Sequence, residues 1–201
     1  EAGRQRLRGR KVAYIAQSAA AAFNPMNTLM DQVTEAALIH GTATREAAEA
    51  KAVQLFRDLA LPDPEGIGRR YPHQVSGGQL QRLMAAMALI TDPDLVVLDE
   101  PTTALDVTTQ IEVLRAFRAV VRGRGATAVY VSHDLAVVAQ MADRIVVLNG
   151  GKIRESDTVD TVINHPKDEY TRMLVAAARP QPRGEARPEK ETPLLEVRGL
   201  V

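Results

Sequence analysis

Two carboxylates follow directly after an apolar run in LVVLDEP, residues 95–101. Such a run is typical of a buried parallel strand, and open α/β sheets bind their ligands at the carboxyl ends of these strands. A carboxylate at Asp99 could hold Mg²⁺, often through water, and one at Glu100 could take a proton from an attacking water molecule. The alternative is a solvated strand end without a chemical role.

A histidine follows a second apolar run. TAVYV (127–131) is followed by Ser132, His133 and Asp134. Because the carboxyl ends of parallel strands meet at one edge of a sheet, we expect His133 at the same edge as the two acids. A lone histidine is more often structural than catalytic, but this one shares an edge with two carboxylates.

The stretch VSGGQLQRLMAAMALI (75–90) begins an apolar helical run with small and polar residues. Ser76 is a good N-cap, and Gly77 and Gly78 would clear side chains away so that an anion can approach the free backbone N–H groups. A capping device alone needs one serine and no second glycine. We therefore predict that residues 76–79, SGGQ, form an anion site.

Alternating helices and strands must position these residues. The predicted helices are 79–91, 108–122 and 134–141, and the predicted strands are 95–99, 127–131 and 144–148. Continuous apolar strands separated by helices indicate an α/β fold with a parallel sheet covered on both faces. Asn149 and Gly150 predict a turn into a hairpin strand, KIRE.

The N-terminal part combines a strand with a helical insert. KVAYIAQ (11–17) reads as a short strand that ends at Gln17, and Asn24-Pro25 signals a turn. Residues 26–61 look all-helical, and their second helix should stop before Pro62. One face of that helix is apolar at helical spacing, at Ala52, Leu55, Phe56 and Leu59.

Composition excludes several classes of protein. The 201 residues contain 25 basic and 25 acidic side chains, so no net basic field favours nucleic acid as a partner. The chain has no cysteine, which excludes disulfides, thiolate zinc sites and thiolate-held iron–sulfur clusters and fits a cytosolic compartment. No apolar run reaches the length of a membrane span, and no signal peptide follows the basic opening. We expect any membrane contact to be made through a partner.

Taken in order, VSGGQLQR, LVVLDEP, TTALD and VSHD resemble the ATPase subunits of ABC transporters, from the signature motif through the Walker B strand and D-loop to the switch histidine. Gln17 is similar to the Q-loop glutamine, although the usual aspartate and proline after it are replaced by Ser18 and Ala19. The resemblance covers about residues 10–178. YPHQVSGGQLQR, DEPTTALDVTTQ and HPKDEYTRML are most similar to ATPases of oligopeptide and dipeptide importers.

The resemblance implies a P-loop NTPase-type parallel sheet flanked by helices, an all-helical signature subdomain, and ATP and Mg²⁺ as cofactors. Two ATPase domains would dimerise head to tail, with each ATP between the Walker A loop of one and the signature helix of the other. Transmembrane permease subunits would be direct partners and an extracytoplasmic solute-binding protein an indirect one, without nucleic acid. The protein would lie peripherally at the cytoplasmic face of the inner (plasma) membrane.

Roles for individual residues also come from the resemblance. Asp99 would bind Mg²⁺ through water, Glu100 would act as general base, and His133 would contact the γ-phosphate. Gln17 would sense the metal and couple the site to the membrane subunit. The residues that would close on the γ-phosphate of the partner domain's nucleotide are Ser76, Gly77, Gly78 and Gln79. Asp106 would link the two sites.

No phosphate-binding motif G-x-x-x-x-G-K-[ST] occurs, and a hairpin turn explains Gly150-Gly151-Lys152 better. After Ala178 the sequence becomes rich in proline and charge, which predicts a linker, and LLEVRGLV then resumes a strand-like pattern. We therefore expect a fragment of a chain with two tandem ATPase domains. The alternative for the last residues is an ordered C-terminal tail.

The expected organisation has five segments. They are a core strand and Q-loop (1–17), a helical subdomain ending in the signature motif and helix (18–91), the ATPase core with a C-terminal extension (92–178), the linker (179–193), and the first strand of a second ATPase domain (194–201).

Rival functions remain within the same family. Translation factors usually carry asparagine and histidine before the leucine and aspartate of the D-loop, where this chain has Thr103 and Ala104. Repair proteins insert long coiled coils, for which residues 18–75 are too few. A non-catalytic regulatory domain would lack the second Walker B acid, whereas Glu100 is present. The expected function is an importer ATPase for peptides or similar small solutes, with the cargo chosen by other subunits.

Overall fold

A computed structural model describes residues 7–102 and 105–178 of the chain. Contacts divide the chain into two compact units, one ending at Ile145 and the other beginning at Val146, and each is described by itself. The segments predicted from sequence for the whole protein stay predictions, and the expected linker and last strand (179–201) lie outside the described residues.

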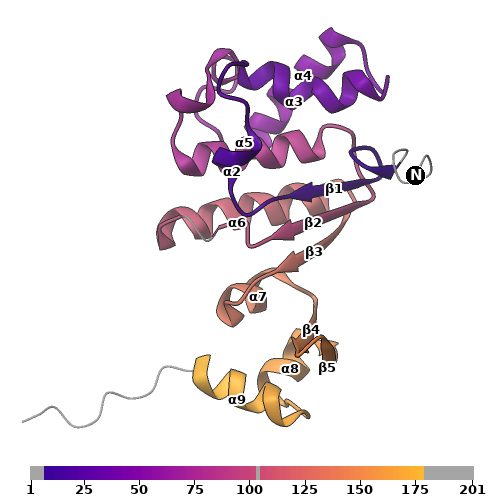
Figure 1. Cartoon of the computed structure of the whole chain (residues 1–201), viewed down its shortest axis with the longest axis vertical. Coiled ribbons are helices and arrows are strands. Elements are labelled where there is room, and N and C mark those ends of the chain that lie inside the picture. The colour runs from indigo at the N-terminus through magenta and orange to yellow at the C-terminus, as the bar shows by residue number, and fades with distance from the viewer. Residues whose placement is uncertain (1–6, 103–104, 179–201) are drawn as a thin grey trace, which may run out of the picture. The chain divides into compact units, whose positions relative to one another are not determined.

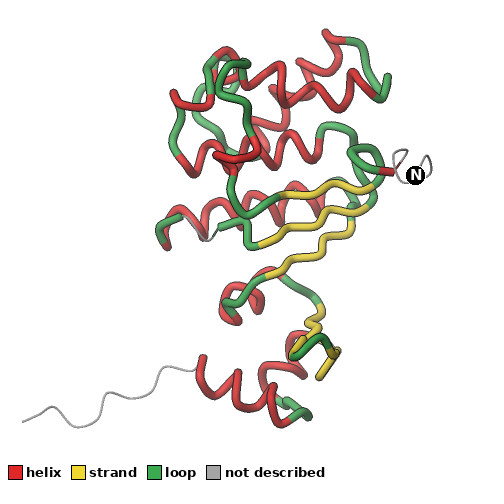
Figure 2. The backbone as a smooth tube through the Cα atoms, viewed as in Figure 1, coloured by secondary structure: helices red, strands yellow, loops and turns green. Residues whose placement is uncertain are grey.

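A three-stranded parallel sheet forms the centre of the first unit (Figures 1 and 2). Its strands are β1 (Val12–Ile15), β2 (Leu95–Asp99) and β3 (Thr127–Val131), in the order β1-β2-β3. In the register, Tyr14 lies opposite Val97, and Val97 lies opposite Val129. The predicted strands are confirmed, and their carboxyl ends meet at one edge as expected.

Helices cover only one face of this sheet in the described part of the chain. α5 (Gly77–Leu89) lies between β1 and β2 in sequence, and α6 (Val107–Gly123) lies between β2 and β3. Both connections step across the sheet in the same direction, and such crossovers are almost always right-handed, so both place their helices on the same face. Helices on the second face, which the sequence also predicts, are not among residues 7–102 and 105–178.

The two faces differ in burial accordingly. Val96 and Leu98 are buried against the helices, whereas Tyr14, Val129 and Val131 on the opposite face are 58%, 46% and 45% exposed. Because successive side chains of a strand point to opposite faces, burial alternates along β1 and β2.

The segment predicted as a fourth parallel strand folds differently. β4 (Arg144–Asn149) pairs with β5 (Lys152–Thr158) in a separate two-stranded sheet. Gly150 and Gly151 turn the chain with φ angles of 58° and 72°, which glycine adopts without steric cost. The hairpin prediction is confirmed, whereas the expectation that this strand extends the parallel sheet is wrong. The hairpin satisfies backbone groups of β4 locally.

Two further helices complete the second unit, α8 (Val159–Asn164) and α9 (Glu169–Ala178). Glu155 of β5 is buried and accepts hydrogen bonds from the backbone N–H groups of Lys167 and Asp168. These hydrogen bonds, with that of Lys167 first, hold the pKa of Glu155 below its ordinary value. The carboxylate thus fixes the chain before α9.

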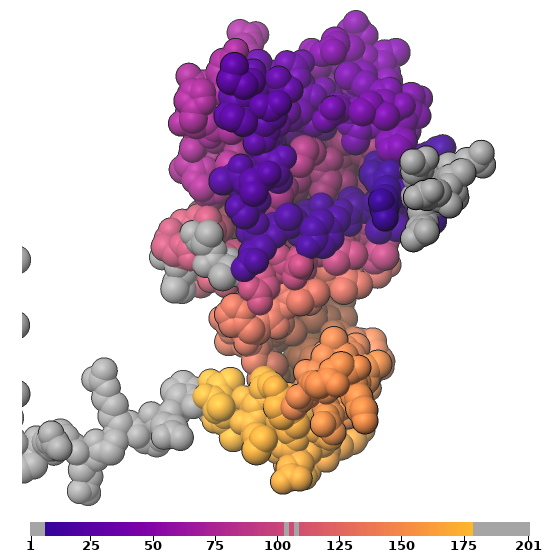
Figure 3. Space-filling model, viewed as in Figure 1, coloured from indigo at the N-terminus to yellow at the C-terminus, as the bar shows by residue number. Residues whose placement is uncertain are grey.

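The helical insert packs on α5. The predicted range, 26–61, contains α3 (Leu29–Ile39) and α4 (Arg45–Asp58). Three shorter elements flank it, α2 (Ala19–Ala22) and the 3₁₀ turns η1 (Ile67–Arg69) and η2 (Pro72–Gln74). Thr28 and Thr44 cap α3 and α4 by accepting from backbone N–H groups. The predicted apolar face around Phe56 is fully buried, which confirms that prediction. Figure 3 shows this insert as one packed mass.

One short helix of the first unit follows the last strand of the parallel sheet. α7 (Leu135–Met141) follows β3, and Asp134 caps it by accepting from the backbone N–H groups of Ala136 and Val137. None of the helices among the described residues is long and apolar enough to span a membrane.

Candidate functional site

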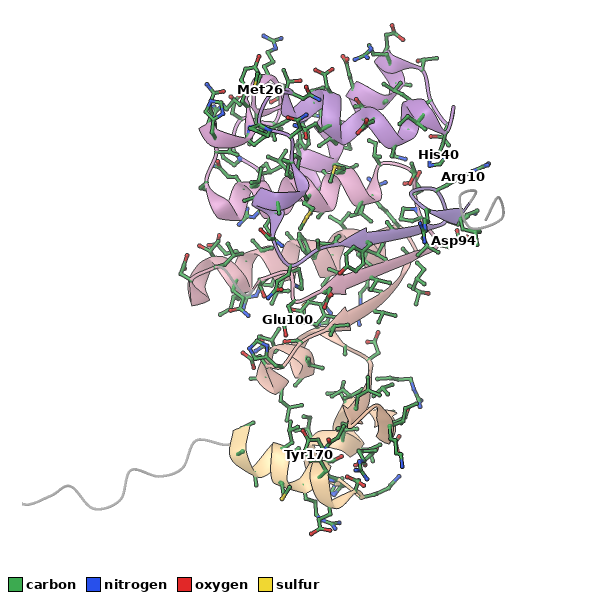
Figure 4. The ribbon with its side chains drawn as sticks, in the orientation of Figure 1. Arg10, Met26, His40, Asp94, Glu100 and Tyr170 are labelled. Carbon is green, nitrogen blue, oxygen red and sulfur yellow. The ribbon has the colours of Figure 1, made fainter. Side chains whose placement is uncertain are left out.

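The carboxyl edge of the sheet brings Gln17, Glu100 and His133 together, each just after a different strand. Oε1 of Glu100 lies 2.9 Å from Nδ1 of His133, and Nε2 of Gln17 donates to Oε2 of Glu100 at 3.3 Å. Figure 4 shows Glu100 at this edge. Sequence reasoning predicted that His133 lies at the same edge as the acids, and the parallel strands explain how residues from distant positions meet there.

Glu100 has a backbone conformation that few residues adopt. Its φ angle is 44°, in the left-handed region, which is uncommon outside glycine. Its N–H still donates to the carbonyl oxygen of Val131 at 3.0 Å, so the sheet hydrogen bonds continue one residue beyond β2. The turn re-aims the side chain toward His133. Residues in such conformations gather at functional sites, because surrounding contacts must hold them there.

Asp99 makes a contact that sequence reasoning missed. The hydroxyl of Tyr14 donates to Oδ2 of Asp99 at 2.7 Å. Tyr14 stands three residues before Gln17, and the alternation of side chains in adjacent strands was the signal that could have identified it.

The Glu100 carboxylate favours the charged form of His133. The hydrogen bond and charge of the Glu100 carboxylate raise the pKa of His133 above its ordinary value of 6.5. A raised pKa means that the charged pair is fully present below the ordinary value and is lost as the pH rises through the raised one.

Glu100→Gln should therefore lower the pKa of His133, because the amide removes the negative charge beside the imidazolium. Titration of the histidine side chains by nuclear magnetic resonance measures this shift directly. The chain has four histidines, and the other three serve as internal references within the same spectra. An unchanged His133 titration would contradict the contact with Glu100.

The predicted anion site is a complete capping box. Oγ of Ser76 accepts from the backbone N–H of Gln79 at 3.3 Å, and Oε1 of Gln79 accepts from the backbone N–H of Ser76 at 3.0 Å. This arrangement satisfies donors at the start of α5. The two polar side chains of the signature therefore begin the helix as well, which is the structural role considered for the serine from sequence.

The two glycines have different surroundings. A Cβ atom on Gly77 would lie 3.9 Å from Leu105, an ordinary contact, whereas one on Gly78 would lie 2.6 Å from Cγ2 of Thr109. Gly78 therefore has a structural reason to lack a side chain, because it is buried against α6, and its predicted part in an anion site stays a prediction. Its lack of a side chain permits close helix packing.

Gly78→Ala should lower the free energy of unfolding by about 1 to 3 kcal/mol, because a methyl group in this contact forces Thr109 or α6 to move. Gly77→Ala is the matched control, one residue away in the same helix, and should change stability by no more than about 0.5 kcal/mol. Urea unfolding of the two variants compares them. Equal stability would show that the α5–α6 contact is not this tight.

Asp106 lies beside the signature helix, α5, and not in the acid cluster, the group formed by Gln17, Glu100 and His133 at the sheet edge. Its side chain caps α6 by accepting from the backbone N–H of Thr109 at 3.0 Å, the residue that Gly78 contacts. The predicted site residues thus form two groups. One surrounds Glu100 at the sheet edge, and the other combines residues 76–79 with the start of α6. Their roles toward a nucleotide stay predictions.

The acids suit a magnesium ion that arrives with a nucleotide. Asp99 and Glu100 offer carboxylate oxygens, the ligands that Mg²⁺ prefers, and Gln17 adds an amide beside them. Within residues 7–102 and 105–178, no group of three or more His, Asp or Glu side chains could hold a metal ion. Mg²⁺ is commonly bound by one or two carboxylates together with substrate phosphates and water, so these residues fit it as part of a nucleotide site.

A parallel sheet with paired acids at its edge, a glutamine and a histidine beside them, and a glycine-rich helix start defines an ATP-binding cassette. The family described as ABC transporter matches residues 2–103, about half of the chain, and the chain belongs to this family. The predicted fold class is confirmed by a solved dimeric ATP-binding cassette in a post-hydrolysis state bound to ADP and Pi. It matches with a TM-score of 0.67 and 25% identity, over 79% of this chain and 67% of that chain.

Curated relatives are ATP-binding proteins of transport and import systems. The metal-staphylopine import system ATP-binding protein CntD of Staphylococcus aureus (strain Mu50) is 37% identical over 89% of this chain and 66% of that protein. The dipeptide transport ATP-binding protein DppD of Bacillus subtilis is 40% identical over 85% of this chain and 51% of that protein. The chain thus spans about half to two thirds of these relatives.

A third relative is the glutathione import ATP-binding protein GsiA of Escherichia coli, which is 39% identical over 85% of this chain and 27% of that protein. The predicted resemblance to the ATPases of peptide importers is confirmed, since proteins named for dipeptide and oligopeptide transport are among the relatives.

Proposed function

We propose that this chain is part of the ATP-hydrolysing subunit of an ABC importer that takes up peptides or similar small solutes. The observation that carries the proposal is the cluster at the sheet edge, in which Gln17 and His133 both contact the carboxylate of Glu100. A carboxylate at this position can take a proton from the water molecule that attacks the γ-phosphate.

Each residue of the cluster has a role in this proposal. Glu100 takes a proton from the water molecule that attacks the γ-phosphate, and His133 contacts that phosphate. Asp99 and Gln17 hold Mg²⁺, which neutralises charge on the phosphates when it is bound. Because hydrolysis depends mostly on positioning and charge stabilisation, closing the site can control its rate.

The second group of residues serves a neighbouring nucleotide. In a head-to-tail dimer with a second ATPase domain, residues 76–79 close on the γ-phosphate held by that domain, and Asp106 links the two sites. The separate position of this group beside α6, rather than in the acid cluster, supports this division. The dimeric state of the solved cassette supports it as well.

The other partners are transmembrane permease subunits and, indirectly, an extracytoplasmic solute-binding protein. They place the subunit at the cytoplasmic face of the inner membrane. Relatives named for glutathione import and metal-staphylopine import support uptake as the direction of transport. Their names differ in cargo, which fits a cargo chosen by subunits other than this one.

Crosslinking tests the transport role, as opposed to a role in translation or repair. The chain has no cysteine, so single cysteines can be placed at the exposed Met26 and Ile39 of the helical insert. We expect both to crosslink to co-expressed permease subunits. A cysteine at Val129 on the exposed sheet face is the control and should crosslink less. Crosslinks from the insert to ribosomal protein or nucleic acid would contradict the proposal.

A further inference from the structure

Tyr14 and Asp99 lie on one face of the parallel sheet because of its register. Tyr14 is opposite Val97, and Asp99 is two residues beyond Val97 on the same strand. Side chains two residues apart point to the same face, and a diagonal neighbour on the adjacent strand is within reach of a long aromatic side chain. The register therefore places the Tyr14 hydroxyl beside the carboxylate of Asp99.

The contact is a short side-chain hydrogen bond between residues 85 positions apart. Oη of Tyr14 lies 2.7 Å from Oδ2 of Asp99, within the range of charge-assisted hydrogen bonds to a carboxylate. A phenol has an ordinary pKa of about 10 and keeps its proton at neutral pH, so Tyr14 is the donor in this bond.

The Tyr14 side chain lies on the face of the sheet that no helix covers in the described part of the chain, and it is more than half exposed there. The neighbouring strand provides a contrast. Tyr130 is opposite Leu98, so it lies on the covered face, where its hydroxyl is 3.4 Å from that of Thr102. The two tyrosines have equal chemistry and different surroundings.

We propose that Tyr14 is a positioning residue for Asp99: its hydroxyl engages Oδ2 and limits the orientations of the carboxylate that would hold the Mg²⁺ of a bound nucleotide. A carboxylate with one oxygen held by a donor has fewer orientations to lose when the metal arrives. The inference rests on the proposed function, in which Asp99 takes part in holding that metal. It adds to the site a residue from β1, Tyr14, which holds the Asp99 carboxylate by a hydrogen bond.

The test separates metal binding from turnover. In the complete subunit, a Glu100→Gln background allows binding to be measured without hydrolysis. Free Mn²⁺, counted by electron paramagnetic resonance, reports metal uptake by the ATP complex. We expect Tyr14→Phe to weaken Mn²⁺ uptake by ~3- to 10-fold, the scale of one lost hydrogen bond. ATP binding in the presence of a chelator should stay unchanged.

Two further variants complete the experiment. Tyr130→Phe removes the same hydroxyl from the covered face and should leave Mn²⁺ uptake as in the parent. Asp99→Asn should weaken it more than Tyr14→Phe does. In the active subunit, Tyr14→Phe should raise the Mg²⁺ concentration needed for half-maximal activity and leave kcat at saturating Mg²⁺ nearly unchanged.

The outcomes distinguish the inference from the proposed function. If Asp99→Asn weakens Mn²⁺ uptake and Tyr14→Phe does not, the positioning role is wrong and the metal role of Asp99 stands. If Asp99→Asn has no effect, the metal role itself is wrong. If Tyr14→Phe also weakens ATP binding in the presence of a chelator, or lowers the midpoint of urea unfolding, the tyrosine has a structural role and the inference is overturned.

Discussion

Glu100→Gln in the complete subunit should reduce ATP turnover by about 100-fold or more, the scale of a lost general base, and leave ATP binding nearly intact. The amide cannot take the proton of the attacking water. It can still accept a hydrogen bond at one atom and donate at the other, so contacts near Gln17 and His133 can persist. The variant should therefore bind ATP about as well as the parent and hydrolyse it much more slowly.

Steady-state phosphate release and nucleotide binding, measured side by side, check this prediction. The matched control is Glu112→Gln, which makes the same chemical change on α6, where the exposed carboxylate pairs with Arg82. The equivalent acid of any second ATPase domain must be replaced in every sample, so that only the site of this chain is measured. Unchanged hydrolysis under those conditions would remove Glu100 from its proposed role.

The 201-residue chain alone should bind Mg-ATP more weakly than about 1 mM and should not hydrolyse it measurably. In P-loop proteins a glycine-rich backbone cradle and its lysine hold the β- and γ-phosphates, and no such motif occurs in this sequence. The start of α5 cannot replace it, because a helix end contributes about 0.3 to 1 kcal/mol when exposed and up to about 2 in favourable sites. Millimolar binding requires roughly 4 kcal/mol.

Isothermal titration and a phosphate-release assay on the chain test this prediction. Micromolar binding, or hydrolysis that Glu100→Gln abolishes, would show that the chain contains a nucleotide site of another kind. The exposed apolar side chains of Val129 and Val131 lie on an edge strand of the described sheet, which favours association between molecules. Sedimentation at several concentrations should therefore accompany the titration.

Much of the fold was predictable from local patterns. Helical spacing identified the buried face around Phe56, and continuous apolar runs identified the strands that end at Asp99 and Val131. These predictions succeeded because periodicity reports which side of an element is buried, whatever it packs against. The meeting of Glu100 with His133 was predictable for a related reason, since parallel strands align their carboxyl ends.

Other features were decided only by the tertiary structure. Two adjacent glycines look alike in sequence, yet only Gly78 is pressed against Thr109, because that contact depends on how α5 crosses α6. The contact between Tyr14 and Asp99 depends on the register of β1 against β2. Sequence alone determined the main elements of the first unit and the types of chemical group, since these follow from residues close together along the chain. Register, helix crossing and the choice of covered face join residues far apart in sequence, so only the assembled sheet and helices determine them.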